Sequence, residues 1–141
     1  MSETRLSRPL GDVDIVLRVA IVALSLGTAY IHLTLGGVLF TLNAVGYLVG
    51  AVAMVIPLGI AVRYRWLIRI GLAGYAATTI VGWAIDPIFY STAYLAKAIE
   101  VALITLLAID FARRDGNPIE RIRELLRRWI AGPHGPASGR A

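Results

Sequence analysis

The sequence predicts an all-helical membrane protein, a bundle of four transmembrane helices arranged as two hairpins. Of its 141 residues, 57% are hydrophobic and only 16% are charged, whereas about a quarter of a soluble domain is charged. Residues 19–62 contain no charged side chain, and this length suffices for two helical crossings. We therefore expect one membrane domain at 15–112, a short cytoplasmic segment at 1–14 and a disordered tail at 132–141.

Four apolar segments follow one another, and each boundary has a physical cause. The Gly-Gly pair at 36–37 separates the first two, because glycine leaves a helix at little steric cost. Arginines and aromatic residues at 63–66 mark a membrane interface before the third segment. Asp86-Pro87 ends the third, since the residue before a proline disfavours the helical conformation. The predicted spans are about 16–37, 41–62, 67–85 and 89–112, with Pro57 tolerated inside the second.

The distribution of arginine predicts the orientation of the bundle. All 13 arginines lie near the start of the first span, between the second and third spans, or after the fourth, and the two other connections contain none. The positive-inside rule then places both termini in the cytoplasm and the protein in the cell membrane. The net charge of +5 is thereby explained without a nucleic-acid partner. The sequence identifies no cofactor, and the absence of Cys excludes disulfides, Cys-ligated metal and covalently attached haem.

After the fourth span, residues 117–131 predict a short amphipathic helix on the inner membrane surface. Asn117 is a typical N-cap with Pro118 at the first helical position, and apolar residues recur at helical spacing. This helix either anchors the topology or binds an anionic lipid or a partner helix. The residues expected at the lipid interface are Arg121, Arg123, Arg127, Arg128 and Trp129.

Small residues predict where the spans pack, because helices in lipid associate by close approach of their backbones. Glycines recur on one face of the second span and one face of the third. We expect both faces to pack within the bundle, and the alternative is a seam between two copies or with a larger membrane complex. The glycines concerned are Gly46, Gly50, Gly71, Gly74 and Gly82.

Two charges in the fourth span are not explained by topology. Lys97 is the only lysine of the chain, and Glu100 falls near the middle of the predicted span. Inserting an isolated charged side chain at that depth of the bilayer costs about 3 kcal/mol or more of free energy. The two side chains form either a structural ion pair or part of a functional site, and Glu100 can alternatively be neutral because a low dielectric disfavours its charged form.

Other polar residues of the same outer half complete a candidate pocket for a small ligand, a proton or an ion. His32 is a candidate proton carrier or ligand-binding imidazole. The competing hypothesis is a non-catalytic accessory or scaffolding subunit. An enzyme is less favoured, because no nucleophile elbow, HExxH motif or phosphate-binding loop is present. The candidate pocket residues are His32, Asn43, Tyr47, Asp86, Tyr94, Lys97 and Glu100.

Overall fold

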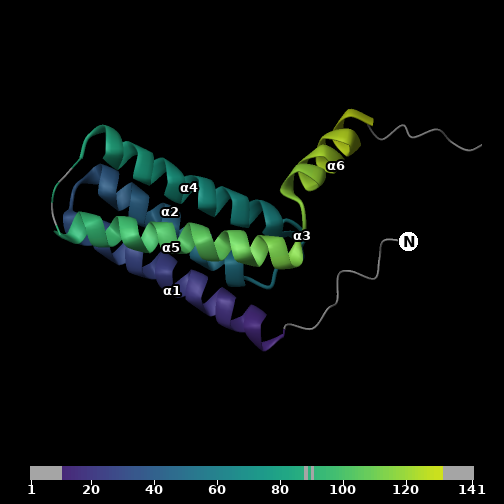
Figure 1. Ribbon diagram of the computed structural model, residues 1–141, viewed down its shortest axis with the longest axis horizontal. Helices are drawn as coiled ribbons and strands as arrows, with labels where there is room; N and C mark the ends of the chain where they lie inside the picture. The colour runs from purple at the N-terminus through teal and green to yellow at the C-terminus, as the bar shows by residue number, and fades with distance from the viewer. Residues whose placement is uncertain (1–10, 88, 90, 132–141) are drawn as a thin grey trace, which may run out of the picture.

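The fold is a bundle of helices, seen in a computed structural model that describes residues 11–87, 89 and 91–131. All regular structure of these residues is helical. Four long helices lie along one another, and a shorter helix projects from one end of the bundle (Figure 1). The predicted tail at 132–141 lies outside the described residues. The helices are α1 (Asp12–Leu35), α2 (Val38–Val55), α3 (Gly59–Arg63), α4 (Arg65–Ile85), α5 (Ser91–Arg114) and α6 (Pro118–Ala131).

Three of these helices, α1, α2 and α4, are long and apolar enough to cross a bilayer, which suggests a membrane location. The structure therefore supports three candidate spans rather than the four that the sequence predicted. The fourth predicted span corresponds to α5, which is as long as α1. However, α5 carries five charged side chains, beginning with Lys97 and ending with Arg114, and these reduce its apolar character.

The turn between α1 and α2 is shorter than predicted. α1 ends at Leu35 and α2 begins at Val38, so only Gly36 and Gly37 lie between them. Both glycines have positive φ angles, 72° and 87°, which other residues adopt only with strain. The α2 helix consequently starts three residues before the predicted boundary at Thr41.

The second predicted span is broken near its end. α2 stops at Val55 and α3 starts at Gly59, with Ile56 and Leu58 both in extended conformations. Pro57 between them lacks an N–H group, and its ring clashes with a preceding carbonyl in a helix. The prediction that this proline is accommodated in a continuous helix was therefore wrong. The carbonyl of Ile56 accepts a hydrogen bond from Arg65 Nη2 at 3.1 Å, which compensates for the break.

The core is apolar in its middle and lies between α1, α2, α4 and α5. α5 packs against both α1 and α4, and α2 packs against the same two helices. Fully buried apolar side chains from these helices fill the space: Ile21, Ala44, Met54, Ala76, Leu103 and Leu107.

The predicted glycine faces differ in their environment. A side chain at Gly50 would meet Leu72 Cδ1 at 2.6 Å, and one at Gly46 would meet Tyr75 Cζ at 2.5 Å, so these glycines permit close contact of α2 with α4. No neighbouring atom lies within 4 Å of the position that a Cβ would take at three glycines of α4. These three point away from the described bundle: Gly71, Gly74 and Gly82.

We expect Gly46→Ala to be less stable than Gly74→Ala by about 2 kcal/mol, the cost of overpacking a filled site. Both variants gain the same helix propensity, but only the methyl group at Gly46 displaces the Tyr75 ring from its 3.0 Å hydrogen bond to Asn43 Oδ1. Thermal unfolding of the two variants in one detergent measures the difference. Equal stabilities would contradict the close approach of α2 and α4.

Candidate functional site

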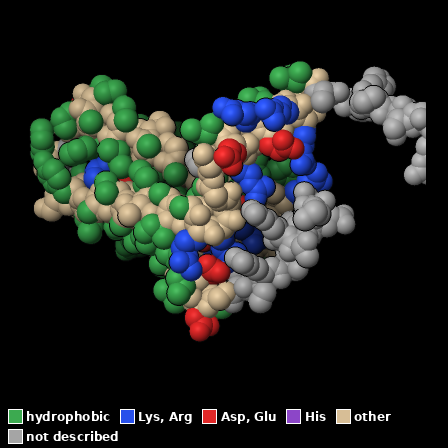
Figure 2. Space-filling model, turned by 45° about the vertical axis from the view of Figure 1, so that its right-hand side comes forward, with side chains coloured by type: hydrophobic (Ala, Val, Ile, Leu, Met, Phe, Trp, Pro, Cys, Tyr) green, Lys and Arg blue, Asp and Glu red, His purple; other side chains and the backbone are tan. Residues whose placement is uncertain are grey.

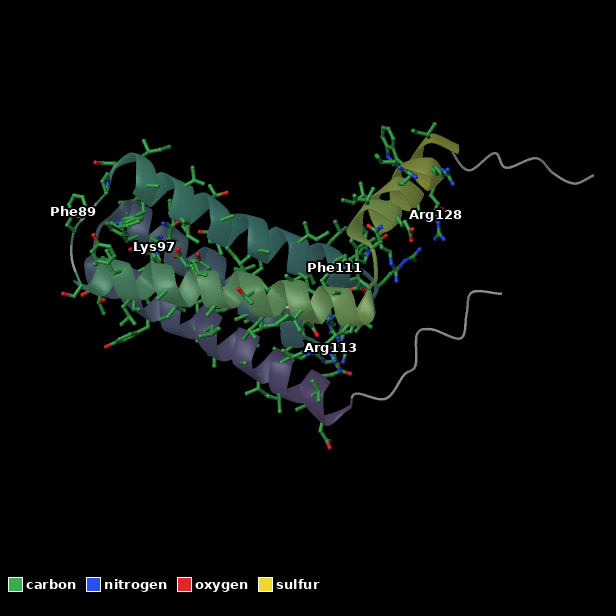
Figure 3. All side chains as sticks on the ribbon, viewed as in Figure 1. Phe89, Lys97, Phe111, Arg113 and Arg128 are labelled. Atoms are coloured by element: carbon green, nitrogen blue, oxygen red, sulfur yellow. The ribbon has the colours of Figure 1, made fainter. Side chains whose placement is uncertain are left out.

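Glu100 lies at the centre of a polar cluster in the half of the bundle that contains the α1–α2 turn. Its side chain is 0% exposed. Lys97 Nζ donates to Glu100 Oε2 at 2.7 Å, and the Thr28 hydroxyl donates to Oε1 at 3.4 Å. Figure 3 shows Lys97 on the part of α5 near this turn, where its side chain points towards the other helices. A carboxylate without access to water is thus held by a cation of its own helix and a hydroxyl of α1.

The imidazole of His32 is oriented by α1 itself. His32 Nδ1 lies 2.8 Å from the carbonyl oxygen of Thr28. A carbonyl only accepts hydrogen bonds, so the hydrogen of the neutral imidazole is on Nδ1. Nε2 then presents a lone pair, and it lies 3.7 Å from Glu100 Oε1. Without a further proton, two acceptors face each other in a buried site.

Aromatic side chains of α2 and α4 complete the cluster. The Tyr47 ring lies 5.7 Å from the His32 ring and 5.0 Å from the Tyr75 ring. The Tyr47 hydroxyl is 3.0 Å from Thr79 Oγ1. Lys97 Nζ also donates to the Thr79 carbonyl at 3.1 Å, so one residue of α4 contacts both sides of the cluster.

The structure brings together four of the seven predicted pocket residues: His32, Tyr47, Lys97 and Glu100. Asn43 lies at the edge of the cluster, because its side chain accepts a hydrogen bond from Tyr75 and, within the described residues, forms none with His32, Lys97 or Glu100. The other two lie elsewhere: the Tyr94 ring is half exposed and packs on Trp83, and Asp86 is exposed after α4.

The cluster is closed rather than a cavity that opens outward. The side chains of Thr28, Tyr47 and Glu100 are 0% exposed, and His32 is 3% exposed. No space for an organic ligand is therefore evident beside Glu100 within the described chain. A proton is the one species that such a site can take up without rearrangement.

A second group of buried charges, at the α6 end of the bundle, was missed in the sequence. Arg69 of α4 is 3% exposed, and Asp110 of α5 is 1% exposed. Arg69 Nε lies 2.5 Å from Asp110 Oδ2, and Arg69 Nη1 lies 2.6 Å from Asp115 Oδ2. Arg114 lies between two carboxylates, 3.3 Å from Asp110 Oδ1 and 2.9 Å from Asp14 Oδ2. This network joins α1, α4 and α5.

A pattern in the sequence could have revealed this network. Glu100, Leu103, Leu107 and Asp110 follow one another at helical spacing, so Asp110 belongs to the buried face of α5. The positive-inside rule accounts for Arg69 together with Arg63 and Arg65, so it gives no sign that the Arg69 side chain is buried. Just beyond α5, burial raises the pKa of the Asp115 carboxyl, and the adjacent guanidinium of Arg69 opposes this rise.

The predicted interfacial residues are exposed on α6. The Arg128 guanidinium pairs with Glu124 at 2.8 Å, and the Trp129 side chain is 83% exposed. In Figure 2, basic side chains gather at this end of the molecule, whereas hydrophobic side chains cover most of the visible bundle surface. Arg121, Arg123 and Arg127 are likewise exposed.

Neither a metal site nor a known relative indicates the chemistry of the cluster. In the part of the chain that the structure describes, no group of three or more His, Cys, Asp or Glu residues could hold a metal ion. Comparison with protein-family models, curated proteins and solved structures finds no match to this chain. The function is therefore argued from the geometry alone.

Replacing Arg69 by Gln should destabilise the protein far more than replacing Arg113 by Gln. The first change leaves buried Asp110 without its closest cation, and breaking a buried pair costs about 3–5 kcal/mol. Arg113 is half exposed and lies 3.7 Å from Asp14, so its loss should cost at most about 1 kcal/mol. Unfolding by sodium dodecyl sulfate in mixed micelles compares the two variants. Similar losses would show that the network contributes little to stability.

Proposed function

We propose that this chain is a four-span membrane protein that takes up and releases a proton at the Glu100–His32 pair. The observation that supports this proposal is the orientation of the imidazole. Because Nδ1 faces a carbonyl oxygen, the lone pair of Nε2 is directed at Glu100 Oε1 from 3.7 Å. A proton between these atoms would replace the repulsion of two acceptors with a hydrogen bond between an imidazolium and a carboxylate.

Lys97 has a distinct part in this proposal. It compensates the charge of Glu100 through Oε2, on the side opposite His32. The ammonium group thus offsets a carboxylate charge in this buried site, and the other carboxyl oxygen is left to share a proton with the imidazole. The Thr28 hydroxyl holds that oxygen in place through its hydrogen bond at 3.4 Å.

In this proposal, α5 crosses the membrane together with α1, α2 and α4. Its 24 residues make a helix roughly 36 Å long, enough to span the hydrocarbon core. Glu100 and Asp110 are buried against other helices, so they avoid contact with lipid. The outward face of α5 includes apolar side chains such as Leu95, Val101 and Ile109. In this proposal the arginine-rich end of the bundle, with both termini of the chain, faces the cytoplasm, and the proton site lies in the outer half.

The C-terminal helix α6 fits the same placement as a helix on the inner membrane surface. Its apolar side chains Ile119, Ile122 and Trp129 are exposed within the described chain, and lipid would cover them. Its arginines would then face the phosphate groups of the cytoplasmic leaflet.

A second candidate function, that of an accessory subunit, is favoured by one observation. The outward face of α4 carries glycines with no neighbour in the described chain, Gly71, Gly74 and Gly82. Small residues of this kind allow another transmembrane helix to approach closely. In such a subunit the Lys97–Glu100 pair would only order the bundle, and its replacement by apolar residues would leave function intact.

Labelling of single cysteines tests the fourth crossing, because the native chain contains no Cys. Ser91→Cys lies at the start of α5, and Asn117→Cys lies between α5 and α6. A membrane-impermeant maleimide added to intact cells should label the first position and should reach the second only after permeabilisation. Labelling of both positions from one side would show that α5 does not cross.

Infrared difference spectroscopy of the reconstituted protein tests the proton site. A change of pH should shift a band of a buried carboxylate group, and this change should be lost in Glu100→Gln and retained in Glu124→Gln, the same substitution at an exposed position. His32→Gln should alter the band, because Glu100 then loses its partner in sharing the proton.

Proteoliposomes containing a pH-sensitive dye distinguish proton binding from proton translocation. A protein that translocates protons should dissipate a pH gradient, and Glu100→Gln should reduce the rate to that of protein-free liposomes. If Glu100→Gln changes neither the infrared band nor the flux while the protein remains folded, the proton-site proposal is wrong.

A further inference from the structure

An apolar groove lies on the outer surface of α1 and α2, away from the proton site. Its volume is about 320 Å³. The walls are apolar side chains that are partly exposed to the surroundings of the bundle, which in a membrane means lipid. Its lining includes Ile15, Val19, Val22, Leu26 and Val55, together with one cationic residue, Arg18.

Arg18 lacks a counter-ion in the part of the chain that the structure describes. Its Nε atom is buried and has no hydrogen-bond partner there. The charges close enough to act on it include those of Arg65, Arg114 and Arg69, and the one acid among them is Asp110. That acid is already paired with Arg69 and Arg114.

Arg65 is a second cation at the same end of the groove. It donates to the carbonyl of Ile56, the residue that follows the groove residue Val55. Its Nε atom is also buried, without a hydrogen-bond partner among residues 11–131 as described. The break of α2 at Pro57 allows this contact, because it frees the carbonyl that Arg65 binds.

The neighbouring carboxylates do not neutralise these two arginines. Asp14, Asp110 and Asp115 are occupied by Arg69, Arg113 and Arg114 in the ion pairs of the described residues. Two partly buried guanidinium groups without a carboxylate partner in the described chain therefore remain at the end of an apolar groove, and the charge of Arg65 acts unfavourably on that of Arg18. An anion that reaches both would offset this repulsion, and guanidinium groups match the geometry of phosphate oxygens.

We propose that this groove binds one acyl chain of an anionic phospholipid and that Arg18 and Arg65 bind its phosphate. The apolar walls match a hydrocarbon chain, and the two cations match the headgroup. The site differs from the amphipathic surface of α6, whose arginines are exposed. It also does not depend on the proton site, since it shares no residue with the cluster around Glu100.

Native mass spectrometry of the full chain, purified in a mild detergent, tests this proposal. The protein is mixed with phosphatidylglycerol or with zwitterionic phosphatidylcholine of the same chain length, and the lipid that remains bound is counted. We expect one phosphatidylglycerol to be retained with a preference over phosphatidylcholine. In the Arg18→Gln/Arg65→Gln variant that preference should fall by about tenfold or more, as expected for two cations near an anionic headgroup.

Two control variants separate the proposed site from general attraction of charge. Arg63→Gln/Arg128→Gln removes the same charge from two exposed arginines and should keep the preference. Ala23→Trp fills the groove without changing any charge and should reduce retention of phosphatidylglycerol. This variant also tests the proposal if the double arginine variant does not fold.

Three results would overturn the proposal. One is equal retention of both lipids by the native chain. Another is an unchanged preference in Arg18→Gln/Arg65→Gln or unchanged retention in Ala23→Trp. The third is displacement of the lipid by millimolar inorganic phosphate, which would show that the two arginines bind a free anion rather than a lipid.

Discussion

A carboxylate inside an apolar bundle must be matched by donors from its surroundings, and α5 buries two of them. Glu100 is held by Lys97 and Thr28, and Asp110 by Arg69 and Arg114. Since an unpaired charge at such depth costs several kcal/mol, these contacts determine which helices flank α5. The position of α5 between α1 and α4 is consistent with this requirement, because each neighbour supplies partners for its acids. The rotation of α5 about its own axis follows from the same pairs.

Most of the buried side chains between the two polar groups are apolar, and buried Ser25, between Ile21 and Thr28 on α1, donates its hydroxyl to the carbonyl of Ile21 at 2.8 Å. Ile21, Met54, Leu103 and Leu107 are fully buried between them. A proton bound at Glu100 has no hydrogen-bonded route through these side chains to the network at Asp110. Because the cluster itself is closed, proton translocation as proposed would require the apolar layer to open. The α6 end carries a larger set of ion pairs, and its connection of α1, α4 and α5 holds that end closed.

Much of the site was predictable from the sequence because charges in an apolar helix are rare and costly. Lys97 and Glu100 stand out for this reason, and His32 lies on the polar face of its own helix. Asp86 was assigned by its depth and Tyr94 also by its helical spacing from Lys97, and the structure places both outside the cluster. Asp110 lies inside the predicted fourth span and was overlooked, although its helical spacing from Glu100 puts it on the same face. The glycines also show that spacing does not specify a neighbour. Spacing identified a small-residue face on both α2 and α4, but the structure shows that Gly46 and Gly50 face another helix, whereas the glycines of α4 do not.

The sequence by itself determined the helical class, the positions of the turns and the unusual charges. Each of these depends on local chemistry: apolar length, the conformational freedom of Gly36 and Gly37, and the cost of a buried ion. Tertiary structure decided which helices are neighbours, and hence that the imidazole of His32 lies beside Glu100 and that Arg65 contacts Ile56, next to the groove that Arg18 lines. It also gave the carbonyl of Ile56, freed where α2 ends at Pro57, a partner in Arg65 at the start of α4. Such pairings depend on distances between separate helices, and no periodicity along one chain encodes those distances.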